Sequence, residues 1–194
     1  MATSKQPSAR ERLLATATTL FYERGITATG VDTVVAESGV SKPTLYAHFR
    51  TKEQLVAAVL ADRDARRRTE IPAWVDAHAR APRAKVLAVF DWLEAFYADG
   101  GARGCAFVNA AAEIPDPDSP ARLTAREQKT WLRDYVESLA RAARLRGPHA
   151  LAVQLQLLIE GVHARVAVDG DPELAREPIA QARAAARTLV RAAS

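Results

Sequence analysis

The segment that most constrains the fold of this chain runs from residue 29 to residue 52. Three of its side chains can accept hydrogen bonds from the unpaired first N–H groups of a helix, namely Thr29, Ser41 and Thr51. Gly39 lies between the first two and suits a tight turn after a short helix. Leu45 and Phe49 then repeat at helical spacing. The segment therefore predicts a helix-turn-helix, with a second helix that is a candidate reader of DNA.

The outward face of this second helix follows from its apolar residues. At about 100° per residue, a helix that turns Leu45 and Phe49 toward the core points Pro43 and Ala47 away from it. Pro43 is tolerated in the first turn, because its missing N–H has no partner to lose there. Such a slim face can enter a major groove. The nearby side chains with the length and donors to hold phosphates are Tyr46, His48 and Lys52.

Positive charge is concentrated in the part of the chain that carries this motif. The net charge is +4, and residues 1–68 hold eleven Lys or Arg against seven Asp or Glu. Residues 69–194 hold sixteen of each. A basic face gains affinity for a polyanion by displacing counterions from its phosphates. Charge alone would fit a solvated surface, but charge together with the motif favours DNA.

The whole chain predicts helices only, about nine in all, so we expect an all-α protein. Ser8 and Glu11 form a capping box that opens a first helix, and residues 1–7 are expected to be a flexible tail. A second capping box, Thr51 with Gln54, opens the fourth helix. Later helices are expected over residues 84–98, 104–114, 120–145, 148–168 and 172–192.

Two domains are expected, a three-helix domain over residues 1–52 and a helical domain over residues 53–194. Pro72 and Pro82 predict a break in the helical pattern, where the two regions would join. Of the last two helices, the one over residues 148–168 is apolar on more than one face, and the one over residues 172–192 is rich in alanine. Two such helices per chain can pack against a twofold copy, so we expect a homodimer. The alternative is that they only close the core of the monomer.

The stretch GVSKPTLYAHFRTKEQL, within the segment from residue 8 to residue 60, closely resembles the DNA-binding domain of the TetR family of bacterial transcriptional regulators. Gly39, Ser41, Thr44, Tyr46, His48, Phe49 and Lys52 carry the resemblance. The rest of the chain matches only in length and helix order. The resemblance implies a ligand-responsive regulator, most simply a repressor that releases a palindromic operator when a small hydrophobic effector binds. Its recognition helices would lie about one helical turn, ~34 Å, apart.

The resemblance also implies which residues contact DNA. Base edges would meet Lys42, Pro43 and Thr44, the DNA backbone would meet Tyr46, His48 and Lys52, and Thr29 would cap a helix start near a phosphate. Gly30 and Asp32 stand where other members often carry a hydroxyl and a basic or amide side chain. We therefore expect less base specificity from the helix that they open.

For the second domain, the resemblance implies a ligand-binding and dimerisation domain with an effector pocket among its middle helices. The residues that could line this pocket are Trp92, Phe96, Cys105, Phe107, Asn109, Trp131, Tyr135 and His163. The alternative for each is ordinary core packing. Cys105 follows Arg103 near an expected helix start, where a thiolate is favoured. It is therefore either a redox or electrophile sensor or a small buried apolar side chain.

Enzymatic chemistry is not indicated, because the sequence has no HExxH, G-x-S-x-G, P-loop or dinucleotide motif. Glu160 and His163 have the spacing of half a di-iron site, but no second E-x-x-H occurs. We predict neither a metal nor a cofactor. A single cysteine and the lack of an export or membrane-spanning segment predict a cytoplasmic protein.

Two alternatives to a ligand-responsive repressor remain open at this point. An architectural or occluding DNA-binding dimer would carry the same helix-turn-helix without any small-molecule effector. A partly apolar cavity in the second domain would favour the regulator, whereas a filled core would favour the architectural protein. An activator would carry the same motif as a repressor, so the sequence does not separate these two.

Overall fold

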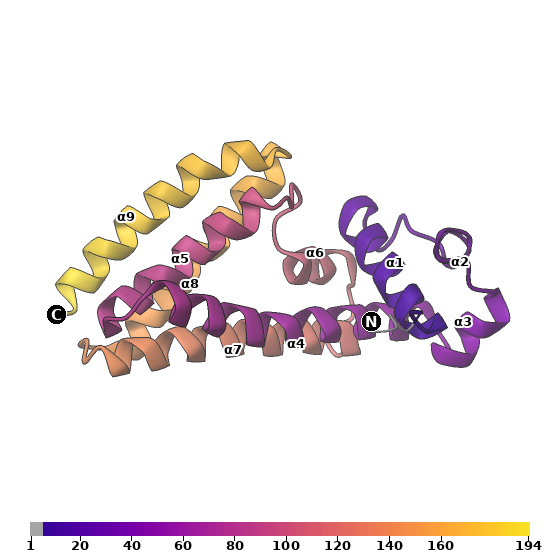
Figure 1. The fold of residues 1–194 in the computed structure, drawn as a ribbon, viewed down its shortest axis with the longest axis horizontal. Coiled ribbons are helices and arrows are strands. Elements are labelled where there is room, and N and C mark those ends of the chain that lie inside the picture. Colours follow the sequence, from indigo (N-terminus) through magenta and orange to yellow (C-terminus); the bar gives the residue numbers. More distant parts are fainter. Residues whose placement is uncertain (1–5) are drawn as a thin grey trace, which may run out of the picture. The chain divides into compact units, whose positions relative to one another are not determined.

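The computed structural model describes residues 6–194, and every regular element in that range is a helix (Figure 1). The elements are α1 (Ala9–Arg24), α2 (Val31–Ser38), α3 (Lys42–His48), α4 (Lys52–His78), α5 (Pro82–Ala98), α6 (Ala106–Glu113), α7 (Pro120–Ala142), α8 (Pro148–Asp169), the 3-10 helix η1 (Pro172–Ala175) and α9 (Arg176–Ala192). The predicted all-α class with about nine helices is confirmed. Residues 1–5 of the expected tail lie outside the described residues.

The chain divides into two compact units. The first comprises Met1–Asp64 and Ala106–Ala125, and the second comprises Ala65–Cys105 and Arg126–Ser194. This division differs from the expected boundary after Lys52, because the first unit includes the start of α4 and all of α6. Helices α4 and α7 each begin in the first unit and end in the second.

The first unit is organised by helix ends that the sequence marks clearly. The Ser8 hydroxyl accepts a hydrogen bond from the Glu11 N–H (3.3 Å), and the Glu11 carboxylate accepts one from the Ser8 N–H (2.7 Å), which confirms the capping box. Gly25 ends α1 with a positive φ of 91°. Helices α1, α2 and α3 pack on one another. Their buried residues include Leu13, Ala17, Leu20, Val34, Leu45 and Phe49.

The predicted cap at Thr29 is wrong. Gly30 is the N-cap of α2, and no side chain caps this helix. The Thr29 hydroxyl instead donates to the carbonyl oxygens of Gly25 (2.7 Å) and Leu20 (3.4 Å), and the residue is buried. Asp32, three residues on, does not bond to Thr29 and pairs with Lys42. Thr29 thus ties the start of α2 to the end of α1.

The predicted break at Pro72 is also wrong, because α4 continues through this residue to His78. A proline inside a helix costs about 3 kcal/mol through its lost hydrogen bond and its ring clash. Ile71 and Val75, on either side of it, are both fully buried in the core of the second unit. Burial of each such side chain contributes about 1.5–3 kcal/mol, which offsets the cost. Pro82, by contrast, does open a new helix, α5.

The second unit is a helical bundle in which α9 packs along both α5 and α8 (Figure 1). Its largest buried side chains include Phe90, Leu93, Tyr97, Leu155 and Ile179. The last expected helix, residues 172–192, begins as the 3-10 helix η1 before α9. Helix α8 is long and apolar enough to cross a membrane by length and composition, but one side of it lies in this core.

Candidate DNA-binding interface and effector region

Helices α2 and α3 form the predicted helix-turn-helix. Gly39 takes the left-handed conformation after α2, with φ 63° and ψ 24°. The Ser41 hydroxyl accepts the Thr44 N–H at 3.3 Å, so this cap is confirmed. Leu45 is 0% exposed and Phe49 is buried. The other face of α3 is open, as the angular count predicts, with Lys42, Pro43, Tyr46, Ala47 and His48 exposed and Thr44 half-buried.

Lys42 is held by an acidic residue of the same unit. Its ammonium lies 2.7 Å from the Asp32 carboxylate, and both side chains are exposed. The hydrogen bond to Asp32, together with the charge of Asp32, raises the pKa of Lys42 above its ordinary value. A phosphate or a base edge must therefore compete with Asp32 for Lys42. Asp32, which departs from the family pattern, thus also pairs with Lys42, a predicted DNA-contacting residue.

Four other predicted contact residues, Thr44, Tyr46, His48 and Lys52, are exposed or half-buried, whereas Thr29 is buried and is not open to a phosphate. The Thr44 hydroxyl is 2.7 Å from the hydroxyl of Ser41, the capping residue of α3. A base that contacts Thr44 would therefore share the Thr44 hydroxyl with Ser41. Tyr46 and His48 are exposed, and Lys52 is half-buried at the start of α4. The Thr51 hydroxyl caps α4 by accepting the Gln54 N–H at 3.2 Å. The Gln54 side-chain oxygen accepts a hydrogen bond from the Arg50 N–H (2.9 Å). In a capping box it would accept the N–H of Thr51 instead.

Replacing Lys52 by alanine is expected to weaken binding to every duplex by a similar factor, because phosphate contacts carry no base preference. The slope of the logarithm of the binding constant against the logarithm of salt concentration should fall by about one. Fluorescence anisotropy at several salt concentrations measures this slope. Lys85→Ala, which removes a lysine of α5 paired with Asp76, is the matched control. An unchanged slope in Lys52→Ala would remove this residue from the interface.

The C-terminal end of helix α6 is bonded to other segments of the first unit. The Glu113 carboxylate accepts the backbone N–H of Thr27 at 2.7 Å, in the loop that joins α1 to α2. Arg122 at the start of α7 donates to the carbonyl oxygens of Ala111 and Ile114. A Cβ added at Gly25 would lie 3.3 Å from both Glu113 carboxylate oxygens. The loop that leads into the helix-turn-helix is therefore bonded to α6.

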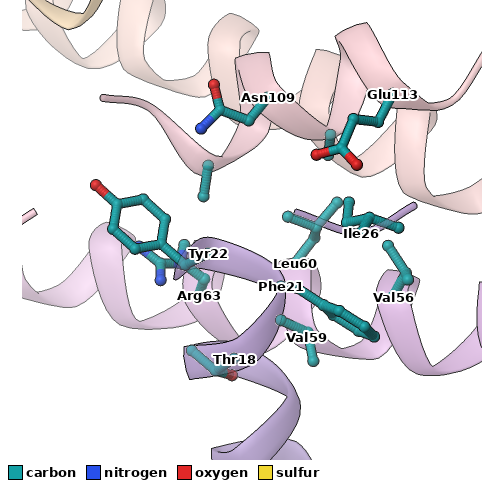
Figure 2. A pocket seen from close by; sticks show the side chains of 12 residues that line it. Thr18, Phe21, Tyr22, Ile26, Val56, Val59, Leu60, Arg63, Asn109 and Glu113 are labelled. Atoms are coloured by element: carbon teal, nitrogen blue, oxygen red, sulfur yellow. The ribbon is translucent and has the colours of Figure 1, made fainter. Parts of the chain in front are cut away.

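A small cavity of about 20 Å³ lies beside this connection, between α1, α4 and α6 (Figure 2). Its walls are mainly apolar, with Phe21, Ile26, Val56, Val59 and Leu60 among them. Asn109 and Glu113 reach toward it from α6 (Figure 2). The space suffices for about one water molecule. Asn109, a predicted effector residue, thus faces a cavity too small for an effector.

The other predicted effector residues do not share one cavity. Trp92 and Phe96 stack at 5.6 Å on a groove of about 620 Å³ between α4 and α5. Trp131 and Tyr135 stack at 5.7 Å on a second groove of about 670 Å³, to which α4 contributes Arg68. Both grooves are open and lie in the second unit. Phe107 is buried in the first unit.

Cys105 and Glu160 both contact Lys129. The Lys129 ammonium is 2.7 Å and 3.0 Å from the two Glu160 carboxylate oxygens, and 3.2 Å from the Cys105 sulfur. Burial works to lower the pKa of Lys129, but its interactions with Cys105 and Glu160 outweigh burial and raise the pKa. Cys105 is buried. Of the two interpretations of this residue, the burial agrees with the packed side chain.

His163 bonds to Tyr97 rather than to Glu160. The Tyr97 hydroxyl and the His163 Nδ1 are 2.5 Å apart. Burial, followed by the charges of Lys129 and Arg67, lowers the pKa of His163 from 6.5 to about 3. The imidazole is therefore neutral at neutral pH.

This neutral imidazole predicts a pH dependence of stability. Below pH 6.5 the unfolded chain takes up a proton at His163, whereas the folded chain does not do so until about pH 3. The free energy of unfolding should therefore decrease as the pH is lowered below 6.5, by up to about 1.4 kcal/mol per pH unit from this residue. His163→Asn should remove that part of the slope in urea titrations between pH 6.5 and pH 4. His48→Asn, at an exposed position, is the control; parallel slopes in wild type and His163→Asn would contradict the assignment.

Some residues of the candidate effector region are not predicted from the sequence. Arg67, Glu70 and Trp74 line the same groove as Trp92 and Phe96. They fall on one helix face at positions i, i+3 and i+7, but this face is visible only if α4 continues through Pro72. Lys129 gave no sequence signal, because its partners come from other parts of the chain.

Two family models match the sequence. Residues 13–59 match the bacterial regulatory proteins of the tetR family, and residues 82–186 match the tetracyclin repressor-like C-terminal domain. Among curated proteins, the transcriptional repressor KstR2 of Mycolicibacterium smegmatis is 44% identical over 61 residues, which are 31% of this chain and 30% of KstR2. The transcriptional activator FasR of the same species is 47% identical over 51 residues, or 26% and 23% of the two chains. The matches to these curated relatives thus span less than a third of their length.

Solved structures match over nearly the whole chain. A TetR-family transcriptional regulator from Streptomyces coelicolor is 35% identical and covers 96% of both chains, with a TM-score of 0.85. The reduced form of NemR from Escherichia coli is 22% identical and covers 94% of this chain and 97% of its own, with a TM-score of 0.81, which shows a shared fold. Together with the two family models, these matches confirm the resemblance. The chain belongs to the TetR family of bacterial regulatory proteins, which are DNA-binding transcriptional regulators and not enzymes.

Proposed function

We propose that this protein is a ligand-responsive transcriptional repressor that binds a palindromic operator and releases it when a small effector binds. The observation that carries the proposal is the open face of α3, where Pro43, Thr44 and Ala47 lie opposite the buried Leu45 and Phe49. Small groups on this face allow the helix to lie deep in a major groove, with Thr44 and Lys42 toward base edges. Tyr46, His48 and Lys52 then hold the phosphates.

A homodimer through α8 and α9 brings two such helices to one operator. Helix α8 has a second apolar or small-sided face besides its core face, formed by the exposed residues Val153, Leu157, Gly161, Ala164 and Val168. Leu157 and Val168 are 66% and 78% exposed. Covering this face with its twofold copy removes apolar surface from water. Burial of this face in the dimer also explains why α8 is so apolar in a regulator that works in the cytoplasm.

Effector binding acts by population shift. An effector that binds better to a conformation with wrongly spaced recognition helices weakens operator binding by that differential affinity and by no more. The two grooves of the second unit, about 620 Å³ and 670 Å³, are within the size range of small-molecule sites. They support the regulator over an architectural DNA-binding dimer that has no effector. Regulators named repressor and activator are both among the relatives, so activation is the second candidate.

A paired screen tests this proposal. Compounds that raise the melting temperature of the full chain are added to its complex with a duplex taken from the DNA upstream of its own gene. The proposal expects at least one stabilising compound to release the duplex in a concentration-dependent way. Stabilising compounds that all leave the complex intact would overturn effector-controlled repression. Compounds that strengthen duplex binding would instead support the activator.

A further inference from the structure

The guanidinium of Arg67, a side chain of α4, lies on the aromatic rings of the groove between α4 and α5. Its central carbon lies 5.0 Å from the ring centroid of Trp92 and 4.4 Å from that of Phe96. These two rings are nearly parallel, with 13° between their planes. A cation over an aromatic face within about 6 Å is attracted by the negative charge of the ring face. The aromatic pair therefore has the geometry of a cation site.

The acidic residues of the groove exceed its basic ones. Glu70 and Asp99 line it, and Arg67 is the single arginine or lysine among its lining residues. The Glu70 carboxylate accepts a hydrogen bond from the Arg67 guanidinium at 2.7 Å, so this pair is neutralised. The carboxylate of Asp99 then leaves the lining with a net negative charge. A cationic ligand meets a complementary field here.

A second aromatic pair adds stacking surface to the same groove. Trp74 and His78 of α4 stack at 3.7 Å with 10° between their ring planes, and both residues line the groove. The His78 Nδ1 is 2.8 Å from the Trp74 carbonyl oxygen, which fixes the orientation of the imidazole. Flat aromatic surfaces with a carboxylate nearby suit a planar ligand that carries its charge in the plane.

The groove between α4 and α7 differs in charge, although it has the same kind of aromatic pair. Arg68 lies over Trp131 at 5.4 Å, in the same manner as Arg67 over Trp92. Its lining contains two arginines, Arg68 and Arg126, and two carboxylates, Glu127 and Asp134. These charges balance, so this groove offers no net attraction to a cation.

We infer that the effector of this regulator is a planar aromatic cation, such as an amidinium or guanidinium compound, which binds the α4–α5 groove in place of the Arg67 side chain. The role of this ligand as an effector rests on the proposed function, whereas the binding site itself does not depend on that function. The ligand takes over the faces of Trp92 and Phe96 and the carboxylate of Glu70. Arg67 thereby acts as an internal competitor, and its release from the groove marks the liganded state.

Three isosteric probes test the charge of the ligand. Benzamidinium, benzamide and benzoate differ in charge but share one planar shape, and calorimetric titration of the full chain measures their binding. We expect benzamidinium to bind at least about tenfold more tightly than benzamide, because the cation–aromatic attraction and the carboxylate act only on the charged probe. Benzoate should not bind measurably. Equal affinities for benzamidinium and benzamide, or tighter binding of benzoate, would overturn the inference.

Substitutions test the site. Arg67→Met keeps an apolar stem but removes the competing guanidinium, so benzamidinium should bind several-fold more tightly. Glu70→Gln should weaken benzamidinium about tenfold, and should leave benzamide unchanged. Arg68→Met, which makes the same change beside Trp131, is the matched control and should leave both affinities unchanged. Thermal melting of each variant verifies folding. An unchanged affinity in folded Arg67→Met, or an equal gain in Arg68→Met, would contradict this location.

Operator release separates this inference from the proposed function. If an effector found by screening releases operator with an affinity that Arg67→Met and Glu70→Gln leave unchanged, the site is wrong and the proposed function stands. If benzamidinium and larger aromatic amidines bind as described and operator affinity stays constant at saturation, the site stands and control of the operator through it is wrong.

Discussion

Leu157→Glu is expected to convert the protein from a dimer to a monomer at micromolar concentration and to weaken operator binding at least about a hundredfold. The substitution puts a charge on the exposed apolar face of α8, where Leu157 is 66% exposed. Desolvating an unpaired carboxylate opposes the association of two such faces. Loss of the dimer removes the second half-site contact, and linking two binding modules commonly raises affinity by about 10²–10⁴.

Leu123→Glu provides the matched control for this result. Leu123 is a leucine of α7 that is 40% exposed and lies in the first unit, outside α8 and α9. Sedimentation velocity should show a dimer for wild type and Leu123→Glu, and a monomer for Leu157→Glu. A dimer of unchanged stability in Leu157→Glu would place the interface elsewhere. A wild-type monomer would contradict the dimer itself.

Gly104→Ala is expected to lower the free energy of unfolding by about 2–5 kcal/mol. A Cβ on this residue would overlap the backbone carbonyl oxygen of His163 and would lie 3.0 Å from the Cβ of Ala167. Gly104 also has a φ of +67°, which disfavours an L side chain. Overpacking costs about 1–3 kcal/mol, and the left-handed backbone adds about 1–2 kcal/mol.

Gly147→Ala separates these two costs. Gly147 has a similar φ of +56°, but a Cβ there would meet no atom within 4 Å. Urea unfolding should therefore show a loss of about 1–2 kcal/mol for Gly147→Ala and a larger loss for Gly104→Ala. Equal losses in the two variants would show that α8 does not approach Gly104 as closely as the structure has it.

The helix-turn-helix was predictable because its determinants are local in sequence. The Ser41 cap, the left-handed Gly39 and the apolar pair Leu45 and Phe49 all act within a few residues of one another. The role of Thr29 was not predictable in this way, because its hydroxyl bonds to carbonyl groups at the end of α1 rather than to the next helix start. A capping residue type thus marks a hydrogen-bonding side chain, whereas its partner depends on the fold.

The course of α4 was not predictable, because the penalty for Pro72 is local but its compensation is not. Ile71 and Val75 stabilise the helix through core contacts made with other helices of the second unit. With a break expected at Pro72, the helix face that carries Arg67, Glu70 and Trp74 was not predicted. The aromatic residue types were recognised as candidates, but their grouping into two grooves depends on which helices pack together. Lys129, which joins residues from separate segments, was out of reach for the same reason.

Base reading by α3 is tested by selecting binding sites from a random duplex library with wild type and Thr44→Ala in parallel. Wild type should enrich a twofold symmetric sequence with half-sites about one helical turn, ~34 Å, apart. Thr44→Ala should enrich a related sequence that has lost preference at one or two base pairs of each half-site. Absence of a symmetric motif, or identical motifs for the two proteins, would contradict base reading by α3.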